Sequence, residues 1–281
     1  MRNTSFIKTL SLCLLWLVVG LARAEVVQVI LPSKLMVSAD YRTGSPSKPA
    51  VILLHGFLQT RLALPMSGLA ETLNDAGYTV LVPTLSGGYN LRNKTLACEA
   101  AQHHSMATDT DEVQFWVGWL KQRTQQPIVL VGHSSSANVV LNYAGDHPDH
   151  RVRQAILVSI VPIKAHPDEL RRTLQAPASN KLAAYTMAYC QHNYLSTRTD
   201  YLSYAIWDEN KIIRALSLSK IPVNVLIGSE DKVFPVGWGM RLQHDFPATE
   251  VVPGAGHFFD GTAEFELGDR VLGLLTTQRK N

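Results

Sequence analysis

Short, continuous apolar runs alternate with segments of helical spacing along most of the chain, and this alternation limits the folds that the chain can adopt. An apolar run of about four to eight residues fits a strand that is covered on both faces, as the strands of a parallel sheet are. Strands that alternate with helices predict an α/β fold, with a mostly parallel sheet and helices on both faces. The predicted strands are Glu25–Ile30, Leu35–Tyr41, Ala50–Leu54, Thr79–Val82, Ile128–Val131, Ala155–Ile160, Val223–Ile227 and Glu250–Val252. The predicted helices are Leu64–Ala76, Asp109–Arg123, Ser135–Ala144 and Phe265–Thr276.

The stretch between the strands Ala155–Ile160 and Val223–Ile227 breaks this alternation. Within it, Glu169–Leu174 and Asn180–Tyr189 have helical character, and aromatic residues are frequent. A connection of that length is more often a functional insert than a bare loop. We therefore expect an insert with its own secondary structure at this point of the chain.

One junction between a strand and a helix carries a motif for nucleophilic catalysis. The strand Ile128–Val131 runs into Gly132-His-Ser134-Ser-Ser136, and a helix begins at once. Such a nucleophile elbow lifts the serine hydroxyl to the edge of the sheet, where the positive end of the next helix points at it. The usual pattern is Gly-x-Ser-x-Gly, and Ser136 stands in place of the last glycine. Ser134 is therefore the candidate nucleophile, and the alternative is a serine-rich turn without chemistry.

Two later positions supply the base and the acid that a serine nucleophile needs. His257 lies in a glycine-flanked loop after the last strand, and Asp231 follows the strand before it. This is the chain order serine, acid, histidine. Asp231 would fix the tautomer of the imidazole and stabilise the imidazolium, and neighbouring Glu230 is the alternative acid.

The loop that begins with His55-Gly56 can turn its backbone toward Ser134. We assign the backbone N–H groups of Phe57 and Ser135 as donors to the oxyanion that forms during acyl transfer. His55 itself is expected to be structural, because the chain order places the base near the C-terminus.

Together these motifs resemble the α/β-hydrolase superfamily, and in particular its esterase/lipase-like branch. The resemblance extends from about residue 50 to residue 276. It implies a single α/β-hydrolase domain over residues 25–281, with an eight-stranded sheet and a helical lid insert of about residues 162–219. In this superfamily the lid largely shapes the substrate pocket, so its aromatic residues are candidates to line that pocket. For any one of them, the alternative is plain packing of the insert onto the sheet. The aromatic residues of this insert include Tyr185, Tyr189, Tyr194, Tyr201, Tyr204 and Trp207.

The resemblance also implies an activity. The leading hypothesis is a serine hydrolase that cleaves a carboxylic ester or related acyl bond through an acyl-enzyme on Ser134, without a cofactor. A peptidase, a thioesterase or a lactonase with the same triad is the first alternative, because pocket shape selects the bond. A non-catalytic binding protein on the same fold is the second.

The first residues have the three-part pattern of a secretory signal peptide. Arg2 and Lys8 precede the apolar run Leu10–Leu21, which ends at the small-x-small site Ala22-Arg-Ala24. We expect residues 1–24 to be removed and the mature protein to be periplasmic or secreted. An uncleaved anchor is the alternative, although the run is shorter than the roughly 20 residues of a membrane span.

Removal of that segment changes the charge balance. The whole chain has 26 basic and 23 acidic residues, and loss of Arg2, Lys8 and Arg23 leaves 23 of each. A mature chain without net charge gives no reason to expect nucleic acid or an anionic membrane surface as a partner. We expect a small acyl compound as the substrate, and the oligomeric state stays open.

Two cysteines, Cys98 and Cys190, remain after the expected cleavage. Export favours a disulfide between them, and two buried thiols are the alternative. Two groups of side chains have some likeness to metal sites: residues 146–150, and Cys98 with His103-His104. Pro148 interrupts the first group and the second has no evident fourth ligand, so we expect no metal.

Overall fold

The computed structural model describes residues 24–146 and 148–277. Residues 1–23, which hold almost all of the predicted signal peptide, lie outside the described residues. Among the helices of the described ranges, none combines the length and the apolar character that crossing a membrane requires.

Eight strands of the described chain form one sheet in the order β1-β2-β4-β3-β5-β6-β9-β10, which confirms the predicted eight-stranded sheet. β2 runs antiparallel to β1 and β4, and the other neighbours run parallel. Parallel neighbours need crossover connections, and these cover the sheet with helices. The strands are β1 (Glu25–Ile30), β2 (Met36–Arg42), β3 (Ala50–Leu54), β4 (Thr79–Pro83), β5 (Ile128–His133), β6 (Val152–Val158), β9 (Val223–Gly228) and β10 (Thr249–Val252).

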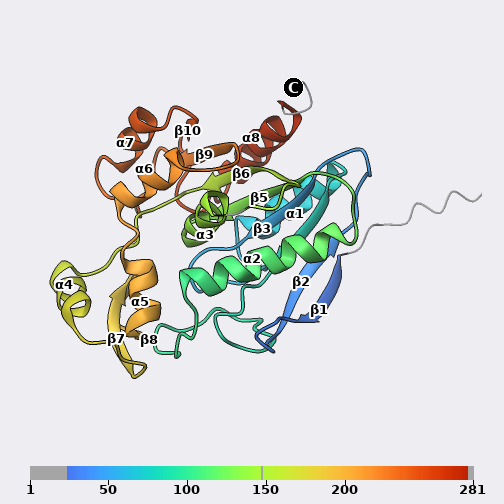
Figure 1. Ribbon diagram of the computed structural model, residues 1–281. Coiled ribbons are helices and arrows are strands. Elements are labelled where there is room, and N and C mark those ends of the chain that lie inside the picture. Colours follow the sequence, from blue (N-terminus) through green and yellow to red (C-terminus); the bar gives the residue numbers. More distant parts are fainter. Residues whose placement is uncertain (1–23, 147, 278–281) are drawn as a thin grey trace, which may run out of the picture.

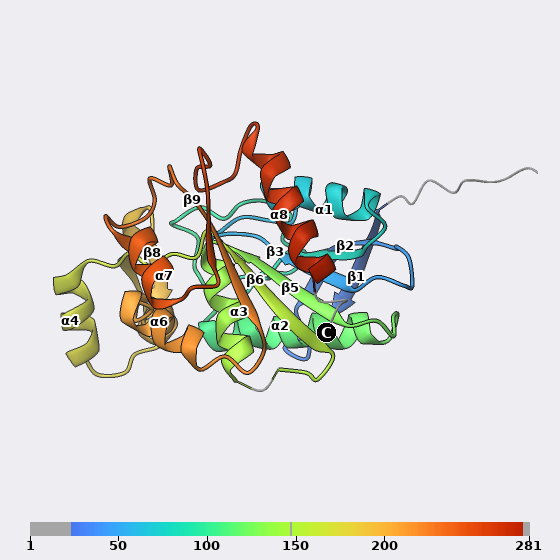
Figure 2. The same ribbon diagram turned by 90° about the horizontal axis from the view of Figure 1, so that it is seen from above.

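Helices lie on both faces of this sheet (Figure 1). The helices α1 (Met66–Asp75) and α8 (Ala263–Thr277) pack together on one face, as Figure 2 shows. On the opposite face, α2 (Met106–Lys121) and α3 (Ser135–Gly145) pack together, with α6 (Glu209–Ser217) against α3.

The sequence does not predict α7 (Trp238–Asp245), which packs beside α6. Its apolar residues Trp238, Met240 and Leu242 alternate with other residues as they would in a strand. In the structure Trp238 and Leu242, one helical turn apart, are buried, while Met240 is exposed. Contact with the rest of the fold therefore decides the helical form of this segment.

Neighbouring residues of the central strands contribute to two separate hydrophobic cores. In β3, Ala50, Ile52 and Leu54 join the core under α2 and α3, while Val51 and Leu53 join the core under α1 and α8. All five side chains are fully buried, and each large one stabilises the fold by roughly 1.5–3 kcal/mol. Burial on both faces is the reason that these strands are continuous apolar runs in the sequence.

The insert between β6 and β9 contains a β-hairpin as well as helices, so the expectation of a helical insert is only partly right. The predicted helix Glu169–Leu174 is present within α4 (Pro167–Gln175). The predicted helix Asn180–Tyr189 is wrong, because this segment forms β7 (Leu182–Met187), the first strand of the hairpin. The remaining elements of the insert before α6 are β8 (Cys190–Thr197) and α5 (Arg198–Ala205).

Pairing with β8 and packing on α5 account for this difference. β7 and β8 are antiparallel, with Tyr185 opposite Tyr194, and the Tyr185 ring stacks on Tyr201 of α5 at 4.1 Å between centroids. The apolar spacing of residues 180–189 fits a helix locally, but the tyrosine and threonine in β7 also suit a strand. The tertiary contacts select the strand.

A disulfide between Cys98 and Cys190 joins the loop after β4 to the start of β8. The two Cα atoms lie 5.7 Å apart, and the cysteines are 92 residues apart in the chain. Backbone hydrogen bonds continue the connection, because Leu195 N–H donates to Cys98 C=O and Gln102 N–H donates to Leu195 C=O. The loop before α2 thus runs along β8 as an added edge of the hairpin.

The disulfide predicts a stability difference. We expect the double variant Cys98→Ala/Cys190→Ala to lose about 2–5 kcal/mol of unfolding free energy, because the crosslink closes a long loop in the unfolded chain. Denaturant unfolding with and without a reductant measures this loss. The reduced wild type should match the double variant, which itself should not respond to the reductant. Equal midpoints for the oxidised wild type and the variant would contradict the prediction.

Candidate active site

Ser134 stands alone between the end of β5 at His133 and the start of α3 at Ser135. Its backbone has φ 54° and ψ −120°, a conformation that non-glycine residues rarely adopt. The turn is possible because Gly132 has no side chain: a Cβ there would lie 2.6 Å from the carbonyl oxygen of Ser136. The structure thus forms the elbow at the junction that the motif indicates.

The structure brings Ser134, His257 and Asp231 into one hydrogen-bonded chain. The Ser134 hydroxyl lies 2.9 Å from His257 Nε2, to which it can donate. His257 Nδ1 lies 2.7 Å from Asp231 Oδ2, and the Asp231 side chain has no exposed surface. Glu230, the alternative acid, is exposed, and the ion pair of His257 is with Asp231. The acid in this arrangement is therefore Asp231.

Two side chains that sequence reasoning missed, those of His133 and Ser159, hold the backbone of His257. Ser159 Oγ donates to the His257 carbonyl at 2.8 Å, and His133 Nε2 donates to the same oxygen at 2.9 Å. Burial and the neighbouring His257 lower the pKa of His133 to about 3, so it stays neutral around pH 7. His133 is the variable residue of the Gly-x-Ser motif, and no local pattern marks it as a support for the base.

The loop after β3 lies directly against the elbow. Ser136, which replaces the usual glycine, donates a hydrogen bond through its hydroxyl to the His55 carbonyl. The His55 ring donates from Nδ1 to Gly56 C=O at 3.0 Å and accepts at Nε2 from Leu85 N–H at 3.1 Å. Burial, and then Arg92, lower the pKa of His55 to about 3, so the neutral ring keeps its acceptor. The expected structural role of His55 is therefore a concrete one: it supports the loop that carries Phe57.

Phe57 and Ser135, the predicted oxyanion donors, line one cavity together with Ser134 and His257. The cavity has a volume of about 580 Å³. The insert supplies part of its wall, including Tyr189 at the tip of the β-hairpin, whose ring packs edge-on against Phe57 at 5.4 Å. The insert therefore lies next to the candidate nucleophile, as a pocket-shaping segment would.

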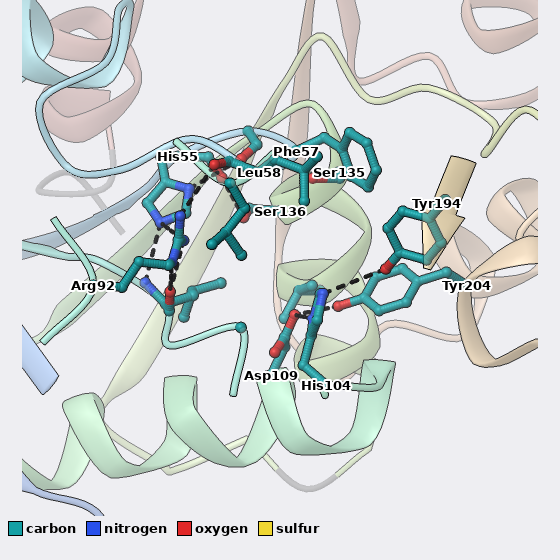
Figure 3. Close-up of a pocket in the computed structure, with 15 residues that line it drawn as sticks. His55, Phe57, Leu58, Arg92, His104, Asp109, Ser135, Ser136, Tyr194 and Tyr204 are labelled. Carbon is teal, nitrogen blue, oxygen red and sulfur yellow. Dashed lines mark hydrogen bonds and ion pairs between the residues drawn. The ribbon is translucent and has the colours of Figure 1, made fainter. Parts of the chain in front are cut away.

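Behind the loop after β3 lies a second, much smaller cavity with a buried polar cluster, shown in Figure 3. Asp109 on α2 accepts hydrogen bonds from His104 Nδ1 at 2.8 Å and from the Tyr204 hydroxyl. Burial alone would lower the pKa of His104, but the Asp109 carboxylate outweighs burial and the net shift is upward. Of the group Cys98 and His103-His104, Cys98 is bridged to Cys190 and His104 is bound to Asp109.

Glu112, one turn along α2 from Asp109, is also buried. It accepts from Ser86 N–H at 2.9 Å and from the Ser86 hydroxyl. Burial and the Asp109 carboxylate raise the pKa of Glu112 to about 7. An acid with a raised pKa in the folded state stabilises the fold at low pH, and this stability is lost as pH rises through the window from about 4.5 to 7.

Glu112→Gln tests this pH dependence. Glutamine stays neutral, and the Ser86 hydroxyl can turn to accept from its amide, so the variant should gain stability relative to wild type between pH 5 and pH 8, by roughly 2 kcal/mol. Thermal unfolding at both pH values measures the difference. Asp111→Asn, at an exposed position of the same helix, is the matched control and should follow the wild type. Parallel pH profiles for wild type and Glu112→Gln would contradict the assignment.

Comparison with known proteins agrees with this geometry. The family model of the alpha/beta hydrolase fold matches residues 49–186. A thermostable monoacylglycerol lipase from Bacillus sp. is 36% identical over 119 residues, which is 42% of this chain and 41% of the lipase. Epoxide hydrolase A of Mycobacterium tuberculosis is 36% identical over 114 residues, 41% of this chain and 33% of that protein. The chain thus matches less than half the length of each of these two relatives.

A solved structure extends the likeness to nearly the whole chain. Est1E from Butyrivibrio proteoclasticus superposes with a TM-score of 0.65 at 17% identity, covering 91% of this chain and 99% of Est1E. At that identity the likeness shows the fold. The strand order, the strained serine at the elbow and these matches lead to one conclusion: the chain has the α/β-hydrolase fold and is similar to that family over residues 49–186.

Proposed function

We propose that this protein is a serine hydrolase that cleaves a carboxylic ester through an acyl-enzyme on Ser134. The observation that carries the proposal is the continuous hydrogen-bonded chain from Ser134 through His257 to Asp231, which opens on a cavity of about 580 Å³. The name of the Bacillus relative, a monoacylglycerol lipase, supports an ester as the substrate class.

In the first half of the reaction, Ser134 Oγ attacks the carbonyl carbon of the ester while its proton passes to His257 Nε2. The carbonyl oxygen becomes an oxyanion, and the backbone N–H groups of Phe57 and Ser135 are the proposed donors to it. When the tetrahedral intermediate collapses, the bond to the alcohol oxygen breaks. His257 returns its proton to the departing alcohol, and the acyl group stays on Ser134.

In the second half, His257 takes a proton from water, and the water oxygen attacks the acyl carbon. Collapse of the second tetrahedral intermediate releases the carboxylic acid, and His257 gives the proton back to Ser134 Oγ. Asp231 accepts a hydrogen bond from His257 Nδ1–H throughout, so the imidazole presents a bare Nε2 to Ser134 and the imidazolium is stabilised. A thioester, a peptide bond or a lactone would follow the same steps, so a substrate panel must separate them.

The proposal predicts covalent labelling of Ser134 by a fluorophosphonate probe and fast turnover of short-chain nitrophenyl esters. Ser134→Ala should abolish labelling, and Ser134→Ala or His257→Ala should lower kcat about 10⁴-fold or more, because each removes a member of the triad. Mass spectrometry locates the label, and ester kinetics measure kcat. Asp231→Asn should also lower kcat. Glu230→Gln, which removes a carboxylate beside the triad, is its matched control and should leave kcat unchanged.

Two results would sink this proposal. One is the absence of a label on Ser134 in the folded wild type. The other is labelling of His257→Ala as fast as wild type. Binding of a specific partner without hydrolysis of any ester, thioester, amide or lactone in a broad panel would instead favour a binding protein on the same fold.

We also propose that the protein is exported and that residues 1–24 are removed on the way. The composition of that segment and the disulfide between Cys98 and Cys190 support export. N-terminal sequencing of the protein from an extracytoplasmic fraction should begin at Glu25. Recovery of the chain only in the cytoplasm, with Met1 or its neighbours intact, would contradict export, and recovery in the membrane would indicate an uncleaved anchor.

A further inference from the structure

Two lysines in the wall of the Ser134 cavity have ammonium groups without a partner in the described part of the chain. Lys164 lies after β6, at the start of the insert, and Lys232 directly follows Asp231 in the loop after β9. Both residues line the cavity and are exposed. Neither ammonium forms an ion pair or a hydrogen bond with a described residue. The backbone of Lys164 is held in place, because its carbonyl accepts from Ala188 N–H in the hairpin turn at 2.8 Å.

Among the described lining residues there is no carboxylate to offset these charges. The other lining side chains are apolar or neutral polar, apart from the two histidines at the nucleophile. The carboxylate nearest in sequence, Asp231, is already engaged: it accepts from His257 and from the backbone N–H of Val233. Its side chain has no exposed surface, so it does not face a ligand in the cavity. The described lining residues therefore place two ammonium groups on the cavity wall and no carboxylate, with the charge of Asp231 lying behind His257.

We propose that this cavity selects acyl substrates that carry a negatively charged group, with a carboxylate as the simplest case, and that Lys164 and Lys232 determine this specificity. The inference rests on the proposed ester hydrolysis and names the substrate class for the same site. A carboxylate inside the cavity is attracted by both ammonium groups, and the attraction is stronger there than in bulk water because fewer water molecules screen it. A neutral ester of the same size gains nothing from either lysine.

The remaining wall suits the uncharged part of such a substrate. Phe57, Tyr189 and Phe258 offer aromatic surface beside Ser134. The lysines come from two different segments of the chain, and each has a long, flexible stem that can follow the position of a charged group. The charge can reside on the acyl chain or on the alcohol, and these two sources are separated by experiment.

Two matched pairs of esters test the inference on the purified full chain. The acyl pair is mono-4-nitrophenyl adipate and 4-nitrophenyl hexanoate, which differ by one terminal carboxylate. The alcohol pair is 4-hexanoyloxybenzoate and 4-hexanoyloxybenzamide. The readout is the ratio of kcat/KM for the anionic ester to kcat/KM for its neutral partner, so that a general loss of activity cancels.

We expect Lys164→Met/Lys232→Met to lower this ratio about 5- to 20-fold in at least one pair, mainly through KM of the anionic ester. The pair that responds identifies the part of the substrate that carries the charge. Lys164→Arg/Lys232→Arg should retain the ratio, and added salt should lower it in the wild type. Lys181→Met, an exposed lysine of the insert outside the cavity wall, is the matched control and should leave it unchanged.

An unchanged ratio in both pairs for the methionine variant overturns the inference. So does an equal fall in the arginine variant, because it would trace the effect to shape and not to charge. Both results require an active enzyme, and thermal unfolding verifies that each variant is folded. If the wild type hydrolyses none of the four esters and Ser134 resists the fluorophosphonate probe, the proposed ester hydrolysis itself fails, and that outcome is distinct from a changed specificity.

Discussion

The backbone conformation of Ser134 is the constraint on which the rest of the site depends. A non-glycine residue at φ 54° and ψ −120° is strained by about 1–3 kcal/mol, and it persists only where the surrounding structure holds it. Here the Ser134 N–H donates to Val158 C=O of β6 at 2.9 Å, and Gly132 leaves room for α3 to start immediately. Because the turn is fixed by the buried central strands, the hydroxyl has a defined position relative to His257.

The sheet and the insert contribute different parts of the site around Ser134. Loops at the ends of strands carry the reacting side chains, and rigid strands suit groups whose mutual distances must be kept within a few tenths of an ångström. The insert supplies part of the cavity wall. Its hairpin turn packs on Phe57 but contributes no side chain to the hydrogen-bonded chain from Ser134 to Asp231. Because the backbone N–H of Phe57 is itself a proposed oxyanion donor, a shift of the hairpin would also move that donor.

The triad could be predicted from the sequence because each member follows its own strand. Ser134, Asp231 and His257 come after β5, β9 and β10, and the carboxyl ends of parallel strands meet at one edge of the sheet. Residues 180–189 could not be predicted, because a local helical spacing says nothing about a partner strand. Asp231 was the predicted acid and adjacent Glu230 the alternative, and in the structure it is Asp231 that bonds to His257.

The buried polar cluster was beyond prediction for a different reason. Asp109 and Tyr204 are 95 residues apart and meet only because α2 and the insert pack together. Ser136 stands where the usual motif has its last glycine. The structure adds a positive contribution, since the hydroxyl gives the buried His55 carbonyl a hydrogen-bond donor.

The crosslink between Cys98 and Cys190 also bears on the outline of the cavity. The wall beside Ser134 contains Tyr189 and Gln191, the two immediate neighbours of Cys190, so the bond ties this part of the wall to the loop after β4. On this side the shape that a substrate meets is held by a covalent bond as well as by packing.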